Sequence, residues 1–101
     1  MDVIFSIGAK ADIKQSAKYY EDAVIGLGKA FLEIIEESVE SIIQYPKSSI
    51  IIKKPYRRYL IERFPFGIIY TEETDTIFIV AVMHLKRKPY YWLEKDEYLK
   101  L

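Results

Sequence analysis

The chain has 101 residues, with 15 basic and 15 acidic side chains, no cysteine and a single histidine. Its length fits one domain, and half of its residues are hydrophobic, so we expect one packed domain over residues 1–101 rather than disorder. The balanced charge gives no bulk argument for a nucleic-acid or membrane partner, and the absence of cysteine excludes disulfides, thiolate catalysis and Cys-ligated zinc.

The first half of the chain predicts one strand and two helices. Residues 3–7 (VIFSI) are mainly β-branched and aromatic, which predicts a short strand. Apolar residues then recur every three or four positions over residues 9–24, as in an amphipathic helix. The glycines of residues 26–28 (GLG) interrupt this pattern, and a second helix is expected from about Lys29 to Tyr45, before Pro46. So short a link predicts an antiparallel helical hairpin.

The second half predicts antiparallel strands. An edge strand is expected at residues 49–53, and further strands at 59–64, 68–71 and 76–84, separated by turns at 64–67 (FPFG) and 72–75. The strand at 76–84 is apolar on both faces, which is typical of an interior strand covered on both sides. Residues 85–101 predict a short final helix or tail. The expected fold is α+β: an N-terminal strand and a two-helix hairpin packed on one face of a three- or four-stranded antiparallel sheet.

No stretch of the sequence resembles a targeting or membrane-spanning segment. Residues 3–7 are too short for the core of a signal peptide, and the longest apolar run, residues 77–83, is far below the ~20 residues that cross a bilayer. We therefore expect a cytoplasmic protein without a membrane partner.

The balanced total charge hides an uneven distribution. Residues 1–45 contain four basic and eight acidic side chains, whereas residues 46–101 contain eleven and seven. Such a dipolar protein can bind a polyanion with one face and a basic or apolar partner with another, although an ordinary solvated surface gives the same pattern. The cations of the second half form two clusters: Lys53, Lys54, Arg57, Arg58 and Arg63, followed by Lys86, Arg87 and Lys88.

Several short motifs carry a resemblance to a known superfamily. In chain order they are residues 19–21 (YYE), 26–28 (GLG) with Phe31, Pro46, 57–60 (RRYL), 63–70 (RFPFGIIY), and 81–89 (AVMHLKRKP) with Trp92. In this order and spacing, over about residues 3–92, the chain resembles the RelE/ParE toxins of bacterial type II toxin–antitoxin modules. The motifs at 63–70 and 81–89 are more similar to the ParE side.

The resemblance implies a small toxin that a cognate antitoxin holds inactive. The sequence itself shows no motif for a metal, nucleotide or organic cofactor, so no cofactor is expected. RelE-type members cleave mRNA on the ribosome, whereas ParE-type members inhibit DNA gyrase without being nucleases. The leading expectation is therefore a gyrase inhibitor, with a ribosome-dependent endoribonuclease acting on mRNA as the alternative. A further alternative is an inactive homologue that only binds antitoxin. A hetero-oligomer with the antitoxin is expected, and a homodimer when the chain is free.

Two sets of binding residues follow from the resemblance and the charge pattern. The second helix has so wide an apolar sector that we expect one sheet face to leave part of it exposed, so the antitoxin is expected to lie on the helical hairpin and along an open sheet edge. The expected antitoxin-binding residues are Tyr19, Phe31, Ile35, Val39 and Ile42. The expected target-binding residues are Lys53, Lys54, Arg57, Arg58, Arg63, Lys86, Arg87, Lys88 and Trp92.

Metal-free RNA cleavage needs a base, an acid and cations that stabilise the phosphorane. The candidate nuclease residues are His84, Arg87, Tyr91 and Arg63. The set is incomplete, because Leu85 stands where ribosome-dependent relatives commonly carry an arginine. Structural roles are the competing interpretation: His84 as a hydrogen-bonded residue at a strand end, the two arginines (Arg58 and Arg63) in cross-strand ion pairs, and Tyr91 with Trp92 holding the tail against the sheet.

Overall fold

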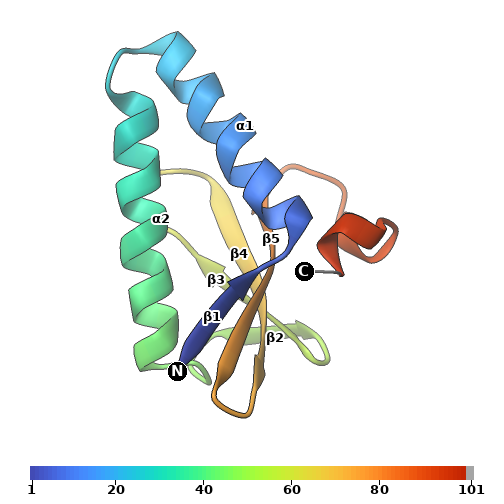
Figure 1. Cartoon of the computed structure of the whole chain (residues 1–101). Coiled ribbons are helices and arrows are strands. Elements are labelled where there is room, and N and C mark those ends of the chain that lie inside the picture. Colours follow the sequence, from blue (N-terminus) through green and yellow to red (C-terminus); the bar gives the residue numbers. More distant parts are fainter. Residues whose placement is uncertain (100–101) are drawn as a thin grey trace.

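The computed structural model describes residues 1–99 and contains two helices and five strands within them (Figure 1). The elements in chain order are β1 (Asp2–Phe5), α1 (Ile7–Ala23), α2 (Leu27–Gln44), β2 (Ile50–Lys53), β3 (Tyr56–Leu60), β4 (Phe66–Glu73) and β5 (Thr76–His84). Two single-turn 3₁₀ helices, η1 (Tyr91–Leu93) and η2 (Asp96–Tyr98), take the place of the short final helix expected in the tail. Residues 100–101 of that expected tail lie outside the described residues.

The five strands form one sheet in the order β1-β5-β4-β3-β2. Strands β2 to β5 are antiparallel neighbours, which confirms the predicted meander, and β1 adds a fifth strand that runs parallel to β5. The helical hairpin covers one face of the sheet, and the tail packs on the other (Figure 1). The α+β prediction is thus confirmed, with β5 in the interior between β1 and β4.

The junction between β1 and α1 corrects the first predicted strand, which was too long at residues 3–7. The strand ends at Phe5 because the Ser6 side chain caps α1, accepting a hydrogen bond from the Ala9 backbone N–H at 2.9 Å. The Ser6 hydroxyl also donates to the carbonyl oxygen of Val80 at 2.6 Å, so the cap is tied to β5. Ile7 is therefore the first residue of the helix.

The strand predicted at residues 59–64 is shifted in the structure. β3 spans Tyr56–Leu60, and residues 61–65 form a loop instead. Arg63 lies in the left-handed region at φ 70°, which breaks the extended conformation, and the side chains of Ile61 and Phe64 turn into the core. The expected turn at 64–67 is likewise displaced, because β4 already begins at Phe66.

The sheet separates two cores, and a β-bulge in β5 determines which residues enter each. Ile69 pairs with Ala81 and Tyr70 pairs with Ile79, so Val80 is an extra residue between them. Val80 and Ala81 both pack in the core beneath the tail, whereas the next residue, Val82, packs beneath the helices. Both faces of β5 are thus covered, as its apolar sequence predicted.

Neither helix within residues 1–99 combines the length and the hydropathy that a membrane-spanning segment needs.

Candidate functional site

One buried carboxylate, that of Asp12 on α1, holds the tail against the sheet. It accepts hydrogen bonds from the Tyr98 hydroxyl at 2.6 Å, the Tyr91 hydroxyl at 3.0 Å and the Val82 backbone N–H at 3.0 Å. Arg87 Nη1 lies 3.7 Å from the same carboxylate, and Arg87 Cζ lies 3.5 Å from the centroid of the Tyr91 ring. Helix α1, strand β5 and the tail therefore meet at a single side chain.

Burial changes the acid–base behaviour of this cluster. It raises the pKa of the Asp12 carboxyl, although the hydrogen bonds from Tyr98, Val82 and Tyr91 and the charge of Arg87 oppose the increase. Burial, together with the nearby Asp12 charge, also raises the pKa of the Tyr91 hydroxyl far above its ordinary value. Burial and the hydrogen bond to Asp12 raise the pKa of Tyr98 to about 12. Both tyrosines are therefore neutral hydrogen-bond donors near pH 7.

Neighbouring arginines of β3 lie on opposite faces of the sheet. Arg57 pairs in register with Tyr70 of the helix-side core, and its Nη1 donates to the carbonyl oxygen of Ser49 at 2.7 Å. Arg58 pairs with Ile69, which belongs to the core beneath the tail. Arg57 therefore binds the loop after α2, and Arg58 lies on the face of the sheet that the tail covers.

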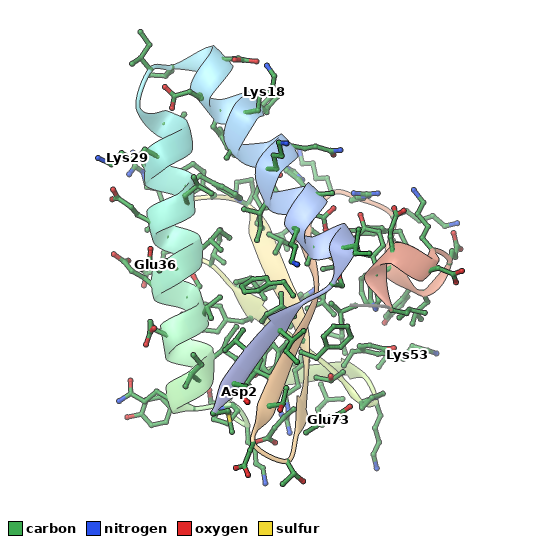
Figure 2. All side chains as sticks on the ribbon, viewed as in Figure 1. Asp2, Lys18, Lys29, Glu36, Lys53 and Glu73 are labelled. Carbon is green, nitrogen blue, oxygen red and sulfur yellow. The ribbon has the colours of Figure 1, made fainter. Side chains whose placement is uncertain are left out.

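A small cavity on the tail side brings two of the predicted cations together. Its volume is about 110 Å³, and Arg58 and Arg87 both line it. Its other walls come from the apolar or aromatic side chains of Ile52, Met83, Leu85, Pro89, Tyr90 and Trp92. Lys53 borders this region, with Nζ 5.8 Å from the centroid of the Tyr90 ring. Figure 2 shows Lys53 on the side of the molecule away from α2.

The remaining predicted cations are exposed and are not among the cavity-lining residues. Lys54 lies in the β2–β3 turn, Lys86 follows β5, and Lys88 Nζ is 3.2 Å from the carboxylate of Glu94. Arg63 lies over the Phe64 ring in the β3–β4 loop. Within residues 1–99 the ion pairs are Lys18–Asp22, Arg87–Asp12 and Lys88–Glu94, so the cross-strand pairs considered for Arg58 and Arg63 are not formed.

Of the four candidate nuclease residues, Arg87 and Tyr91 are in contact, whereas the ring contacts of His84 and Arg63 are with other residues. The His84 ring packs against Phe66 of the helix-side core, with centroids 5.2 Å apart, and its Nδ1 accepts a hydrogen bond from the Lys86 backbone N–H at 3.0 Å. Tyr91 belongs instead to the core beneath the tail. His84 therefore has the structural environment of a hydrogen-bonded residue at a strand end. Within residues 1–99 no cluster of three or more histidine, aspartate or glutamate side chains offers a metal site.

Tyr91 and Trp92 hold the tail in place, as the structural interpretation predicted. They are 4% and 1% exposed, and both pack on the sheet face opposite the helices. Trp92, which was also expected to contact the target, exposes almost none of its side chain while the tail stays docked.

The residues expected to bind antitoxin are mostly in the core. Phe31, Ile35 and Ile42 are at most 5% exposed, and Val39 is half-buried. Most of the apolar sector of α2 is covered by α1 and the sheet, and Ile34, Val39 and Ile43 remain only partly buried. Tyr19 is the member of the set that remains exposed. The exposed apolar side chains of the hairpin are Ile7 at the start of α1, Tyr19, Val24 and Ile25 around the link between the helices, and Leu32 of α2.

An apolar groove lies beside these residues, between α1 and α2. It is open to solvent, has a volume of about 310 Å³ and is lined by Ala17, Gly28 and Leu32, with Lys18, Glu21 and Lys29 around them. The helices approach closely at Gly28, where a Cβ would lie 2.5 Å from the carbonyl oxygen of Ala17. Lys18 and Lys29 project outward at this end of the hairpin (Figure 2).

Within residues 1–99 the two outer strands of the sheet each have one edge that pairs with no further strand. β2 forms one edge and carries Ile50 and Ile51, which are 60% and 50% exposed. β1 forms the other edge, with Ile4 partly exposed. An edge strand with exposed β-branched residues can pair with an extended segment of another chain.

Sequence reasoning did not identify Asp12 as a central residue. The sequence does contain an indication that Asp12 is buried. Asp12 lies three residues after Ala9 and just before Ile13, within the apolar stripe of the first helix. A carboxylate at such a position is buried by the helix and must find donors, which Tyr91 and Tyr98 supply from the tail.

Two comparisons with known proteins agree with this architecture. A family model described as "ParE toxin of type II toxin-antitoxin system, parDE" matches residues 3–89. A solved structure described as "Chromosomal ParDE TA system from P. aeruginosa" has the same fold, with a TM-score of 0.70 and 22% sequence identity over 85% of this chain and 97% of that chain. No curated protein sequence matches the chain.

Proposed function

Because this chain belongs to the ParE toxin family of type II toxin–antitoxin systems, we propose that it is a toxin that binds and inhibits DNA gyrase and is neutralised by a cognate antitoxin. The observation that carries the proposal is the family match over residues 3–89, which includes both helices and all of β2 to β5. Gyrase works on DNA in the cytoplasm, so the same proposal places the toxin there.

The antitoxin has two surfaces on which to bind. The groove between α1 and α2 offers apolar contacts at Leu32 to an amphipathic helix. The β2 edge offers backbone hydrogen bonds, with Ile50 and Ile51 beside them, to an extended segment. These are the helix-in-groove and strand-addition modes by which peptides are commonly recognised. Occupying both would give a hetero-oligomer, and in the free chain the same apolar surfaces favour a homodimer.

The tail side of the sheet is the proposed target-binding surface. Arg58, Arg87 and Lys53 gather around the cavity there, whereas the acidic side chains Glu33, Glu36, Glu37 and Glu40 belong to α2 on the other side. Inhibition by binding, rather than by RNA cleavage, is supported by the separation of His84 from Tyr91 and by the raised pKa of Tyr91.

The proposal is tested in cells. Expression of the chain should arrest growth and shift a reporter plasmid toward relaxed topoisomers, and co-expression of the antitoxin encoded beside it should reverse both effects. Growth arrest with normal plasmid supercoiling and with mRNAs cut within their coding regions would instead support the ribosome-dependent nuclease.

A further inference from the structure

Two buried N–H groups have no hydrogen-bond acceptor within residues 1–99. They are Nε of Arg58, on β3, and Nε1 of Trp92, in η1. Buried donors are nearly always paired, because an unpaired one has lost its hydration without compensation. Trp92 is 1% exposed, so bulk water does not replace the missing acceptor for its indole.

Both unpaired donors belong to residues that line the same cavity of about 110 Å³. Arg87 and Tyr90 also line it, and the Tyr90 hydroxyl already donates to the carbonyl oxygen of Ile52 at 3.2 Å. The arginine and indole groups of the lining are all donors. Both nitrogens are shielded from a water-sized molecule in the structure, so an acceptor in the cavity would first meet the guanidinium groups of Arg58 and Arg87 and would reach the two unpaired donors only after a small local shift. Because the arginine donors are cationic, an anionic acceptor is favoured over a neutral one.

The local charge also favours an anion. Arg58 takes part in none of the ion pairs within residues 1–99, and Arg87 Nη1 is 3.7 Å from the Asp12 carboxylate, which already accepts three hydrogen bonds. The cavity is therefore lined by two guanidinium groups with one carboxylate nearby, which leaves an excess of positive charge. Lys53 at its border adds to that excess.

The size and walls of the cavity restrict the ligand. Its walls include Ile52, Met83 and Leu85, which match a short methylene chain. A phosphodiester would bring sugars on both sides of its charge, which such a small, largely apolar space does not accommodate. An acidic amino-acid side chain carries a planar anion at the end of one or two methylenes, and arginine binds that anion well.

We propose that the cavity between Arg58, Arg87 and Trp92 is a carboxylate-binding site that receives a glutamate or aspartate side chain of a partner polypeptide. The site rests on the proposed function, because Arg58 and Arg87 also belong to the proposed target-binding surface, and it names the chemical group that they bind. The binding measurement below needs neither gyrase nor antitoxin, so it can fail while the proposed function holds. It also gives Trp92 a role at the base of a binding site without requiring the tail to lift from the sheet.

The chain contains its own reporter for this site, because Trp92 is its only tryptophan. The indole N–H of the full-length ¹⁵N-labelled protein therefore gives one resonance in a two-dimensional NMR spectrum. The probe is N-acetylglutamate N-methylamide, whose only charge is the side-chain carboxylate. N-acetylglutamine N-methylamide is the neutral control at matched ionic strength, and dimethyl phosphate represents a nucleic-acid backbone.

We expect the glutamate derivative to move the indole N–H resonance in a saturable way at millimolar concentrations, and the glutamine derivative to leave it in place. Arg58→Met keeps the side-chain stem that packs on Gly67 but removes the guanidinium, and should weaken binding about tenfold. Lys14→Gln removes an equal charge from an exposed position of α1 and should leave the affinity unchanged.

Three results would overturn the proposal: no saturable shift with the glutamate derivative, an equal shift with the glutamine derivative, or tighter binding of dimethyl phosphate. The last would assign the cavity to nucleic acid instead. A second measurement does not depend on any variant. Contacts between the indole N–H and the ligand methylenes, seen as intermolecular nuclear Overhauser effects in the wild-type protein, are required by the proposal, and their absence at saturation would refute it.

Discussion

The hydroxyl of Tyr98 donates a hydrogen bond of 2.6 Å to the carboxylate of Asp12, although the two residues are 86 positions apart in the sequence. Both side chains are buried, and the contact joins the first helix to the last turn of the described chain. The position of the tail, and with it the wall that Trp92 contributes to the cavity, therefore depends on a residue in α1.

Replacing Asp12 should destabilise the protein far more than replacing another aspartate of the same helix. Asp12→Ala leaves the donors of Tyr91, Tyr98 and Val82 without their acceptor, and should lower the free energy of unfolding by about 2–4 kcal/mol. Asp22→Ala removes only an exposed pair with Lys18 and should cost less than ~0.5 kcal/mol. Urea unfolding measures both, and similar losses would mean that the Asp12 cluster does not stabilise the fold.

Stability should fall at alkaline pH because of Tyr98. Its pKa rises from 10.0 to about 12 in the folded chain, so between these values the folded state binds more protons than the unfolded state. The contribution is complete below pH 10.0 and is lost as the pH rises toward 12. The raised pKa of Tyr91 acts in the same direction.

The comparison that isolates this effect uses Tyr98→Phe and, as the control, Tyr45→Phe at an exposed position. Urea unfolding across the alkaline range should show a shallower loss of stability in Tyr98→Phe than in the wild type, and an unchanged loss in Tyr45→Phe. Parallel pH profiles for all three proteins would contradict the shifted pKa of Tyr98.

Gly8 should be intolerant of alanine because of the tail. A Cβ at Gly8 would lie 2.3 Å from Cδ1 of the Tyr98 ring, so Gly8→Ala must displace that ring. Alanine is the better helix former by about 1 kcal/mol, yet we expect a net loss of stability of about 1–3 kcal/mol from the forced displacement. The fluorescence of Trp92 should change as the tail moves.

The control for that experiment is Gly26→Ala. Nothing lies within 4 Å of a Cβ at Gly26, but the residue has φ 89°, so alanine is strained there. It should cost about 1 kcal/mol without altering Trp92 fluorescence. A Gly8→Ala protein as stable as the wild type, with unchanged fluorescence, would show that the tail does not pack on α1 as described.

Antitoxin binding should depend on Leu32. This side chain lines the groove between α1 and α2 and is 44% exposed, so Leu32→Gln should weaken the complex about tenfold while leaving the stability of the free toxin nearly unchanged. Glu36→Gln alters an exposed side chain of the same helix that is not among the groove residues and should have little effect. Calorimetric titration with the antitoxin measures both, and equal affinities would exclude the groove as the binding surface.

Much of the fold could be predicted from local sequence patterns. The helical periods gave α1 and α2, and the apolar run at 76–84 gave an interior strand with the bounds that β5 has. The parallel pairing of β1 with β5 could not be predicted in this way, because it joins Val3 to Ile77 and leaves no local signature. The bulge at Val80 could not be predicted either. A bulge changes which residues of a strand face each side of the sheet, and in a strand that is apolar throughout this change leaves no trace in the sequence.

The candidate site was harder to predict than the fold, because it depends on side-chain direction and on contacts between residues far apart in the sequence. The basic residues Arg57 and Arg58 look equivalent in the sequence, but neighbouring strand residues point to opposite faces, so only Arg58 reaches the cavity. Phe31 and Ile42 were placed on a binding surface because one sheet face was expected to be too small to bury them, whereas α1 supplies the additional cover. Asp12 depends on partners in the tail, which no local pattern connects to α1.

The proposed inhibition of gyrase by binding is tested most directly by parallel assays with purified components. The purified chain is added to DNA gyrase with relaxed plasmid and, separately, to programmed ribosomes with mRNA, using His84→Ala and Arg58→Glu beside the wild type. We predict that supercoiling is inhibited by the wild type and by His84→Ala, less by Arg58→Glu, and that the mRNA stays intact. Cleaved mRNA with unimpaired supercoiling, abolished by His84→Ala in a protein that still folds, would contradict it.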